Sequence, residues 1–135
     1  MKLVVYTDGG SRGNPGNAAI GVVFPDLGKE YGEAIGKATN NVAEYSALIF
    51  ALKKAKQLIG KEKAGETDIE VRSDSELMVS QLSGRYKLKE DGLKDLFIEV
   101  WNLKQDFKSV SFHHIPREQN KKADALVNRA LDTLL

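Results

Sequence analysis

Residues 2–7, Lys2-Leu-Val-Val-Tyr-Thr7, form an almost unbroken run of aliphatic, β-branched and aromatic side chains. Such a run, without polar alternation, is typical of a strand that is buried on both faces of its sheet. A dense turn segment follows at Gly9–Gly16, and two further strand patterns, at 17–24 and 29–38, flank the turn Pro25-Asp-Leu-Gly28. The short connections predict that the first three strands form an antiparallel meander.

The rest of the chain alternates between helical and extended patterns. The predicted elements, in chain order, are a helix at 41–59, a polar loop at 60–66, a strand at 67–73, a short helix from the capping pattern Ser73-Asp-Ser-Glu76 to Gly84, a helix at 92–107, a strand at 110–115 and a helix from 118 or 119 to 134. Strand–helix–strand crossovers require parallel pairing. We therefore predict one α/β domain over residues 1–135, with a mixed five-stranded sheet (three antiparallel strands, then parallel strands) and helices on both faces.

The composition limits the classes of protein that fit. Of the 135 residues, 41% are hydrophobic and 29% are charged, and 20 Lys and Arg against 19 Asp and Glu give a net charge of +1. This balance excludes general disorder and a strongly basic field, so any nucleic-acid binding must come from local patches. The absence of cysteine excludes disulfides, thiolate metal sites and a cysteine nucleophile. Because there is no apolar run of about 20 residues and no signal-peptide pattern, we expect a cytoplasmic protein.

Four acidic residues occupy positions that a solvated acid has no reason to favour. Asp8 follows the most apolar strand, and Asp74 follows the strand at 67–73. If these strands run parallel, both carboxylates emerge at the carboxyl edge of the sheet, where α/β sheets bind ligands. Glu44 and Asp124 each border the apolar stripe of a helix. Asp74 can simply cap its helix and Glu44 can simply favour a helix N-terminus, but all four together point to one shared site.

Converging carboxylates repel one another unless cations compensate them. Two divalent cations balance four carboxylates, and oxygen ligands without cysteine or a histidine-rich spacing select Mg²⁺ or Mn²⁺ over Zn²⁺. Such a pair of ions performs in-line phosphoryl chemistry, in which one ion activates water and the other stabilises the leaving oxygen. The sequence thus predicts a two-metal site whose ligands are Asp8, Glu44, Asp74 and Asp124.

Four motifs lie in order along nearly the whole chain: Tyr6-Thr-Asp-Gly-Gly-Ser-Arg-Gly-Asn-Pro-Gly16, Thr39-Asn-Asn-Val-Ala-Glu-Tyr-Ser-Ala-Leu48, Arg72-Ser-Asp-Ser-Glu-Leu-Met-Val79 and Asn120-Lys-Lys-Ala-Asp-Ala-Leu126. Together they resemble the motifs of the type 1 ribonuclease H family. The resemblance implies that family's mixed five-stranded sheet. It implies a metal-dependent endoribonuclease that hydrolyses the RNA strand of RNA–DNA hybrids, leaving 5′-phosphate and 3′-hydroxyl ends, with the four acids as catalytic metal ligands.

The resemblance also implies partners. It implies a monomer that binds the hybrid duplex and no membrane, and it leaves open whether double-stranded RNA is cut and whether Mg²⁺ or Mn²⁺ is preferred. Asn14, Asn40 and Asn41 resemble amides that reach the minor groove, where 2′-hydroxyls distinguish RNA from DNA. Thr39 resembles a residue that contacts a DNA-strand phosphate, and Gly9 is expected beside them in substrate binding. Taken alone, Asn14 is typical of a turn, Asn40 of a helix N-cap and Thr39 of a strand.

The sequence departs from many relatives in lacking a basic, aromatic-rich insertion. Only Gly84-Arg-Tyr-Lys-Leu-Lys-Glu-Asp-Gly92 stands in its place, which makes this a compact form. Within it, Arg85 and Lys87, together with Tyr86 and Lys89, form either a reduced substrate-binding element or a solvated basic turn.

A second departure is the absence of a mobile Gly-His loop before the last acid. The stretch here is His113-His-Ile-Pro-Arg-Glu-Gln-Asn120. Strand alternation directs only one of its two histidines towards the site. We expect Arg117 to be the auxiliary catalytic group, because arginine stays protonated and can hold a phosphate although it cannot act as a base. His114 is the alternative auxiliary group, and a third possibility is that neither residue has this role.

Three other functions are weighed against a nuclease. A non-catalytic hybrid-binding module has no need to keep four mutually repelling acids. A nucleotide-binding protein would use Gly9–Gly16 as a phosphate loop, but this segment lacks Gly-Lys-Ser/Thr and leads into a strand. A protein-interaction domain would use Lys53, Lys54 and Lys56, which a solvated helix face explains more simply.

Overall fold

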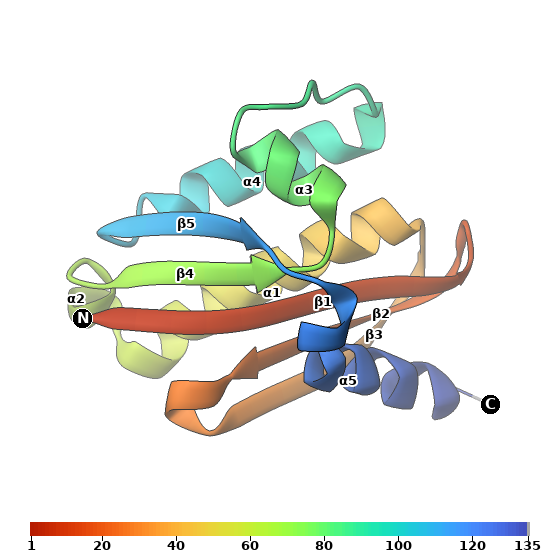
Figure 1. Ribbon diagram of the computed structural model, residues 1–135, viewed down its shortest axis with the longest axis horizontal. Helices are drawn as coiled ribbons and strands as arrows, with labels where there is room; N and C mark the ends of the chain where they lie inside the picture. The colour runs from red at the N-terminus through yellow and green to blue at the C-terminus, as the bar shows by residue number, and fades with distance from the viewer. Residues whose placement is uncertain (135) are drawn as a thin grey trace.

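The computed structural model describes residues 1–134 and contains a five-stranded mixed sheet (Figure 1). Its strands are β1 (Lys2–Gly13), β2 (Gly16–Phe24), β3 (Lys29–Ala38), β4 (Asp68–Ser73) and β5 (Ser109–His114). They lie in the order β3-β2-β1-β4-β5. The pairs β1–β2 and β2–β3 are antiparallel, whereas β1–β4 and β4–β5 are parallel. The predicted fold class is confirmed.

Helices cover both faces of this sheet (Figure 1). They are α1 (Asn40–Ile59), α2 (Lys61–Ala64), α3 (Glu76–Leu82), α4 (Asp91–Lys104) and α5 (Lys121–Asp132), with short 3₁₀ turns η1 (Pro25–Leu27) and η2 (Arg117–Gln119). The helices α1 to α4 share one hydrophobic core with the sheet, and α5 packs on the opposite face against β2 and β3. Within residues 1–134, no helix combines the length and the apolar character needed to cross a membrane.

The strands divide their side chains between two cores. Leu3 and Val5 of β1 pack into the larger core with Leu48 of α1. On the other face, Val23 of β2 packs against Leu126 of α5. In β1, Leu3 and Val5 are buried, but Lys2 is exposed and Val4 and Tyr6 are only half-buried. The prediction that residues 2–7 are buried on both faces is therefore wrong, because α5 covers the second face mainly over β2 and β3.

The glycine-rich segment after Asp8 differs from the prediction. It is not a turn, because β1 continues through it to Gly13 and pairs residue by residue with β2. The turn between the two strands is only Asn14-Pro15. Asp8 therefore lies within a long strand rather than at its end. The reason is long-range pairing: β2 supplies hydrogen-bond partners that a local pattern of glycines does not reveal.

Smaller corrections concern the ends of other elements. The predicted loop at 60–66 contains the short helix α2. The last helix begins only at Lys121, because Arg117–Gln119 forms the separate turn η2. The short helix α3 begins at Glu76 and its N-cap is Ser75, whose hydroxyl accepts a hydrogen bond from the Met78 amide. The predicted capping pattern starting at Ser73 is therefore wrong in register.

Candidate functional site

The four predicted acids meet in one open hollow of about 320 Å³, formed by β1, α1, α5 and the end of β4. Carboxylate oxygens of Asp8, Glu44 and Asp74 lie within 4.8 Å of one another. Asp124 lines the same hollow, and its negative charge contributes to raising the pKa of Asp8. Segments more than 100 residues apart in the chain thus place four acids around one space.

The parallel pairing of β1 and β4 brings the two sheet acids together. Thr7 of β1 lies opposite Ser73 of β4, and this is the last pair of the β1–β4 register. The next residues, Asp8 and Asp74, therefore lie side by side just beyond the end of that pairing. Asp8 is buried, with 6% of its surface exposed. Asp74 does not cap α3, because Ser75 does, so the local explanation for this acid does not apply.

A close approach of α1 to β1 positions Glu44. The backbone N–H of Gly9 donates a hydrogen bond of 2.8 Å to Glu44 Oε1. A Cβ atom at Gly9 would lie 2.5 Å from the backbone nitrogen of Glu44, so only glycine permits the helix to come this near. Gly9, predicted to contact substrate, here holds an acid in place.

Two contacts hold Asp124 at the same edge. The Asn120 side chain is buried and its Nδ2 donates a hydrogen bond of 2.8 Å to the carbonyl oxygen of Thr7. Beside Asp8 on β2, Gly21 lets α5 pack directly on the strand, because a Cβ there would lie 3.2 Å from Leu126 Cβ and closer to the backbone of Ala123. Sequence reasoning assigned no role to Asn120 or Gly21; a polar residue four before Asp124 was the only local signal.

The acids cannot all be ionised without compensating charge. Burial, together with repulsion from Asp74 and Asp124, raises the pKa of Asp8 to about 8. Burial, together with repulsion from Asp8 and Asp74, raises the pKa of Glu44 well above its ordinary value. Burial also raises the pKa of Asp74, although the positive charge of Arg117 opposes that shift. The hollow therefore favours protons or cations among its carboxylates.

The donors in this hollow fit a hard cation. They are carboxylate oxygens, and Asp74 Oδ2 is buried without a hydrogen-bond partner within residues 1–134. A buried acceptor without a partner is unfavourable unless something else occupies it. Oxygen-only donor sets of this kind suit Mg²⁺ or Mn²⁺.

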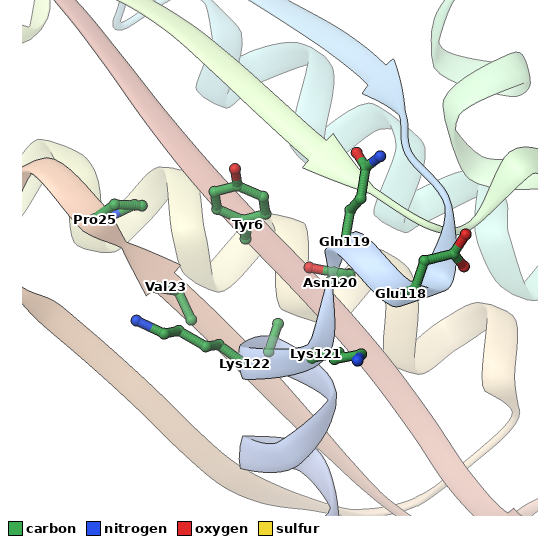
Figure 2. Close-up of a pocket in the computed structure, with 9 residues that line it drawn as sticks. Tyr6, Val23, Pro25, Glu118, Gln119, Asn120, Lys121 and Lys122 are labelled. Atoms are coloured by element: carbon green, nitrogen blue, oxygen red, sulfur yellow. The ribbon is translucent and has the colours of Figure 1, made fainter.

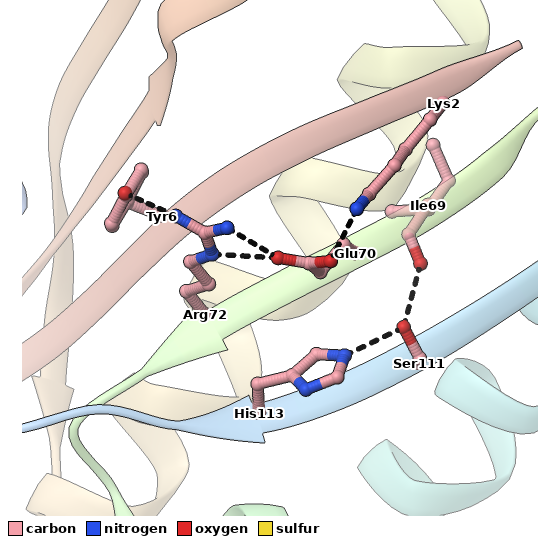
Figure 3. A network of polar contacts seen from close by, with 7 residues as sticks. All are labelled: Lys2, Tyr6, Ile69, Glu70, Arg72, Ser111 and His113. Carbon is pink, nitrogen blue, oxygen red and sulfur yellow. Dashed lines mark hydrogen bonds and ion pairs between the residues drawn. The ribbon is translucent and has the colours of Figure 1, made fainter.

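Arg117 is the cation that faces the acids. It extends from η2 into the lining of the hollow, whereas neither histidine belongs to the lining. His113 lies in register with Arg72 and Tyr6, on the α5 side of the sheet and outside the lining of the hollow, and its Nε2 lies 2.9 Å from Ser111 Oγ (Figure 3). Nearby on this face, Arg72 bonds both Glu70 and the hydroxyl of Tyr6 (Figure 3). His114 ends β5, opposite Ser73, and is exposed.

Polar residues at the start of α1 extend the site along the surface. Asn40 lines the acid hollow together with Ser11, and its Oδ1 accepts a hydrogen bond of 2.9 Å from the Ser11 amide. The Asn40 amide in turn donates to Asn14 Oδ1 at 3.0 Å. Thr39 is the N-cap of α1, so Thr39 and not Asn40 has that role. Asn41 donates to Glu90, a residue that sequence reasoning left without a role.

The reduced basic segment forms a separate hollow of about 530 Å³. Its lining includes Arg85, Tyr86, Lys87 and Lys89, and also Glu90, which connects it to Asn41. Arg85 and Lys87 therefore do not reach the acids but lie beyond the amides, on the side of α3 and α4.

A third hollow, of about 320 Å³, lies on the other side of the η2–α5 connection (Figure 2). Tyr6, Val23 and Pro25 form one wall, and residues 118–123 form the other. None of the four acids lines it. Only the buried Asn120 belongs both to this lining and to the contacts that hold the acid site.

Comparison with known proteins identifies relatives along nearly the whole chain. Residues 6–130 match the model of a protein family described as reverse transcriptase-like. The chain is 45% identical over 135 residues to ribonuclease HI of Halobacterium salinarum, covering 97% of this chain and 65% of that protein. It is 42% identical over 137 residues to a bifunctional protein of Mycobacterium tuberculosis, covering 98% of this chain and 36% of that protein. The chain thus spans about a third of the mycobacterial relative and just under two thirds of the other.

Solved structures agree with this match. LC11-RNase H1, isolated from compost, is 47% identical and gives a TM-score of 0.90, covering 98% of this chain and 97% of that chain. A structure of LC11-RNase H1 in complex with an RNA/DNA hybrid gives a TM-score of 0.90 at 46% identity, covering 98% of both chains.

Proposed function

Because the chain belongs to the type 1 ribonuclease H family, we propose that it is an endoribonuclease that hydrolyses the RNA strand of RNA–DNA hybrids. The observation that carries the proposal is the hollow in which oxygens of Asp8, Glu44 and Asp74 lie within 4.8 Å of one another, beside Asp124. The complex of LC11-RNase H1 with an RNA/DNA hybrid supports the choice of substrate.

We assign the four acids as ligands of two divalent cations, Mg²⁺ or Mn²⁺. The raised pKa values of Asp8, Glu44 and Asp74 support this assignment, since each reflects carboxylates held together in a buried space without compensating charge. When bound, the two ions supply activation of the water nucleophile and stabilisation of the leaving oxygen.

In the proposed reaction, the oxygen of a water molecule forms a bond to phosphorus and the bond from phosphorus to O3′ breaks. One water proton goes to the departing O3′, so the products carry a 5′-phosphate and a 3′-hydroxyl. The negative charge on the phosphoryl oxygens grows during this step. Arg117 is placed to stabilise it, because its guanidinium lines the hollow and stays protonated.

The duplex is proposed to lie across the start of α1. The hydroxyl of Thr39 accepts from the Val42 amide at 3.2 Å, which leaves its hydrogen for a DNA-strand phosphate. Asn14, Asn40 and Asn41 follow in the direction of the minor groove, and Arg85 and Lys87 extend positive charge beyond them. Affinity then comes from phosphate contacts and selectivity from the amides.

We place this activity in the cytoplasm and assign it to a single copy of the chain. The cysteine-free sequence suits a reducing compartment, and one chain supplies all four acids. Size-exclusion chromatography should give the mass of a monomer, and an obligate dimer would contradict the assignment.

Cleavage of three end-labelled duplexes, hybrid, RNA–RNA and DNA–DNA, in Mg²⁺ and in Mn²⁺, tests the proposal. We expect hybrid cleavage that chelation with EDTA abolishes and that Asp8→Asn and Asp74→Asn eliminate. Asp26→Asn, an exposed acid on the turn η1, is the matched control and should cleave normally. Tight hybrid binding without cleavage in either metal would instead indicate a non-catalytic binding module.

A further inference from the structure

The protein neighbours of the three amides determine which end of each amide remains for substrate. Asn40 Oδ1 accepts from both the amide and the hydroxyl of Ser11, at 2.9 and 3.2 Å. Asn14 Oδ1 accepts from the Asn40 amide at 3.0 Å. A backbone N–H can only donate, so the oxygen of each side chain must face it. Asn14 and Asn40 are therefore left with their NH₂ groups as donors.

Asn41 has the opposite orientation. Its Nδ2 donates a hydrogen bond of 2.9 Å to Glu90 Oε1. A carboxylate can only accept, so the NH₂ end of Asn41 must face Glu90 and its carbonyl oxygen is left as an acceptor. Glu90 stands at the N-cap position of α4 but makes no side-chain capping bond to its own helix. Within residues 1–134, the hydrogen bond of the Glu90 carboxylate is the one that it accepts from Asn41 of α1.

An acceptor and a donor differ in what they can recognise on a nucleic acid. The minor-groove edges of adenine, thymine and uracil offer only acceptors, in RNA and DNA alike. The 2′-hydroxyl adds a donor that deoxyribose lacks. A carbonyl oxygen therefore senses the 2′-hydroxyl hydrogen directly, whereas an NH₂ group also finds acceptors on bases that both strands share.

We propose that Glu90 is a positioning residue for substrate selection: it orients Asn41 so that the carbonyl oxygen of Asn41 accepts from a ribose 2′-hydroxyl. The inference rests on the proposed function, since it concerns how that same site distinguishes RNA from DNA. It assigns to the compact segment before α4 a role in selectivity in addition to its basic residues. The Asn41 motif alone does not fix this orientation, because an amide can present either end.

The test compares hybrids whose RNA strand contains only adenine and uracil, each with a single deoxynucleotide at a different position. Because neither strand of such a hybrid contains guanine, whose N2 amino group is the only base donor in the minor groove, the ribose 2′-hydroxyl is the only donor in that groove. The contact lies at the position where a deoxynucleotide lowers kcat/KM of the wild-type protein but not that of Asn41→Ala. There, the wild-type protein should lose roughly two- to tenfold in kcat/KM, mainly through KM, as expected for one hydrogen bond.

Three variants separate orientation from charge. Glu90→Ala frees Asn41 to rotate, and Glu90→Lys presents a donor that turns the Asn41 oxygen inwards. In both variants, the ratio of kcat/KM for the all-ribose hybrid to kcat/KM for the hybrid with a deoxynucleotide at that position should fall towards one. This should hold at that position alone, even though the lysine strengthens overall binding to phosphates. Asp91→Lys, at the adjacent exposed acid paired with Lys94, makes the same charge change without contacting Asn41, and should retain the wild-type ratio.

Each result is decisive. In the double variant Asn41→Ala/Glu90→Ala the losses should not add, because both act through one contact. Thermal unfolding of each variant checks that the fold is kept. If Glu90→Ala and Glu90→Lys keep the wild-type ratio, or if Asp91→Lys changes it as much as Glu90→Lys, the positioning role is refuted. If the wild-type protein cleaves no hybrid at all, the proposed function fails instead.

Discussion

Gly9→Ala should separate the acid on α1 from the acids on the sheet. A Cβ atom at Gly9 would lie 2.5 Å from the backbone nitrogen of Glu44, whereas ordinary van der Waals contact begins at 3.4 Å. The obstacle is helix backbone, which cannot rotate away as a flexible side chain can. The helix must therefore retreat from β1 by at least about 0.9 Å, the difference between these two distances, because the carbonyl group of Ala43 lies closer still to that Cβ.

A shift of this size affects both stability and catalysis. It would lengthen the hydrogen bond from the Gly9 amide to Glu44 Oε1 from 2.8 Å to about 3.7 Å, where the bond no longer exists. Overpacking typically lowers the free energy of unfolding by about 1–3 kcal/mol. A catalytic group misplaced by about 1 Å reduces the rate by about 10²-fold.

Urea unfolding and hybrid cleavage measure the two effects on one preparation. Gly92→Ala is the matched control, because a Cβ there meets nothing within 4 Å and the residue lies in the first turn of α4. That variant should unfold with a free energy higher by up to about 1 kcal/mol and cleave normally. If Gly9→Ala is as stable and as active as wild type, the close approach of α1 does not position Glu44 and the reasoning is wrong.

Substitutions at three further positions, Asp8, Gly21 and Arg117, probe the acid hollow and the packing that supports it. The pKa of Asp8 is raised from 3.8 to about 8, so between pH 4 and pH 8 the folded wild-type protein binds more protons than the unfolded chain and loses stability as the pH rises. In EDTA, the free energy of unfolding of Asp8→Asn should therefore rise relative to that of wild type by a few kcal/mol across this range. Equal pH profiles of urea unfolding for the two proteins would contradict this. Gly21→Ala should displace α5, because its Cβ would lie 3.2 Å from Leu126 Cβ and closer to the Ala123 carbonyl, and should lower both stability and cleavage, while Gly10→Ala, whose nearest neighbour is a side-chain methyl at 3.5 Å, should change neither. Arg117→Ala should lower kcat by roughly 10²-fold with little change in the melting temperature, with partial recovery in Arg117→Lys; normal turnover would exclude its proposed role.

The pattern of side chains predicted most of the helices and strands, because these elements follow the local periodicity of apolar residues. The apolar run at 2–7 identified the strand β1, although only one of its faces is fully buried, and the stripe along 41–59 identified α1 within one residue. The glycine-rich half of β1 could not be predicted in this way. Glycines 9 and 10 resemble a turn until the partner strand β2 and the close approach of α1 are known, and both are long-range features.

The candidate site was predictable to the extent that sheet topology determines it. Parallel pairing places Asp8 and Asp74 at neighbouring positions whatever the details of the loops. The contacts that fix the remaining acids were not visible, because Asn120 bonds a carbonyl 113 residues away and Gly9 bonds a carboxylate 35 residues away.

The orientation of the amides illustrates a limit that no motif overcomes. Asn40 and Asn41 are adjacent and chemically identical, yet Ser11, 29 residues from Asn40, and Glu90, 49 residues from Asn41, turn them in opposite senses. An amide is symmetric in shape but not in hydrogen bonding, so its neighbour decides whether it donates or accepts. Two chains that share this pair of asparagines but differ at position 90 should therefore differ in how strongly they distinguish ribose from deoxyribose, although their motifs are the same.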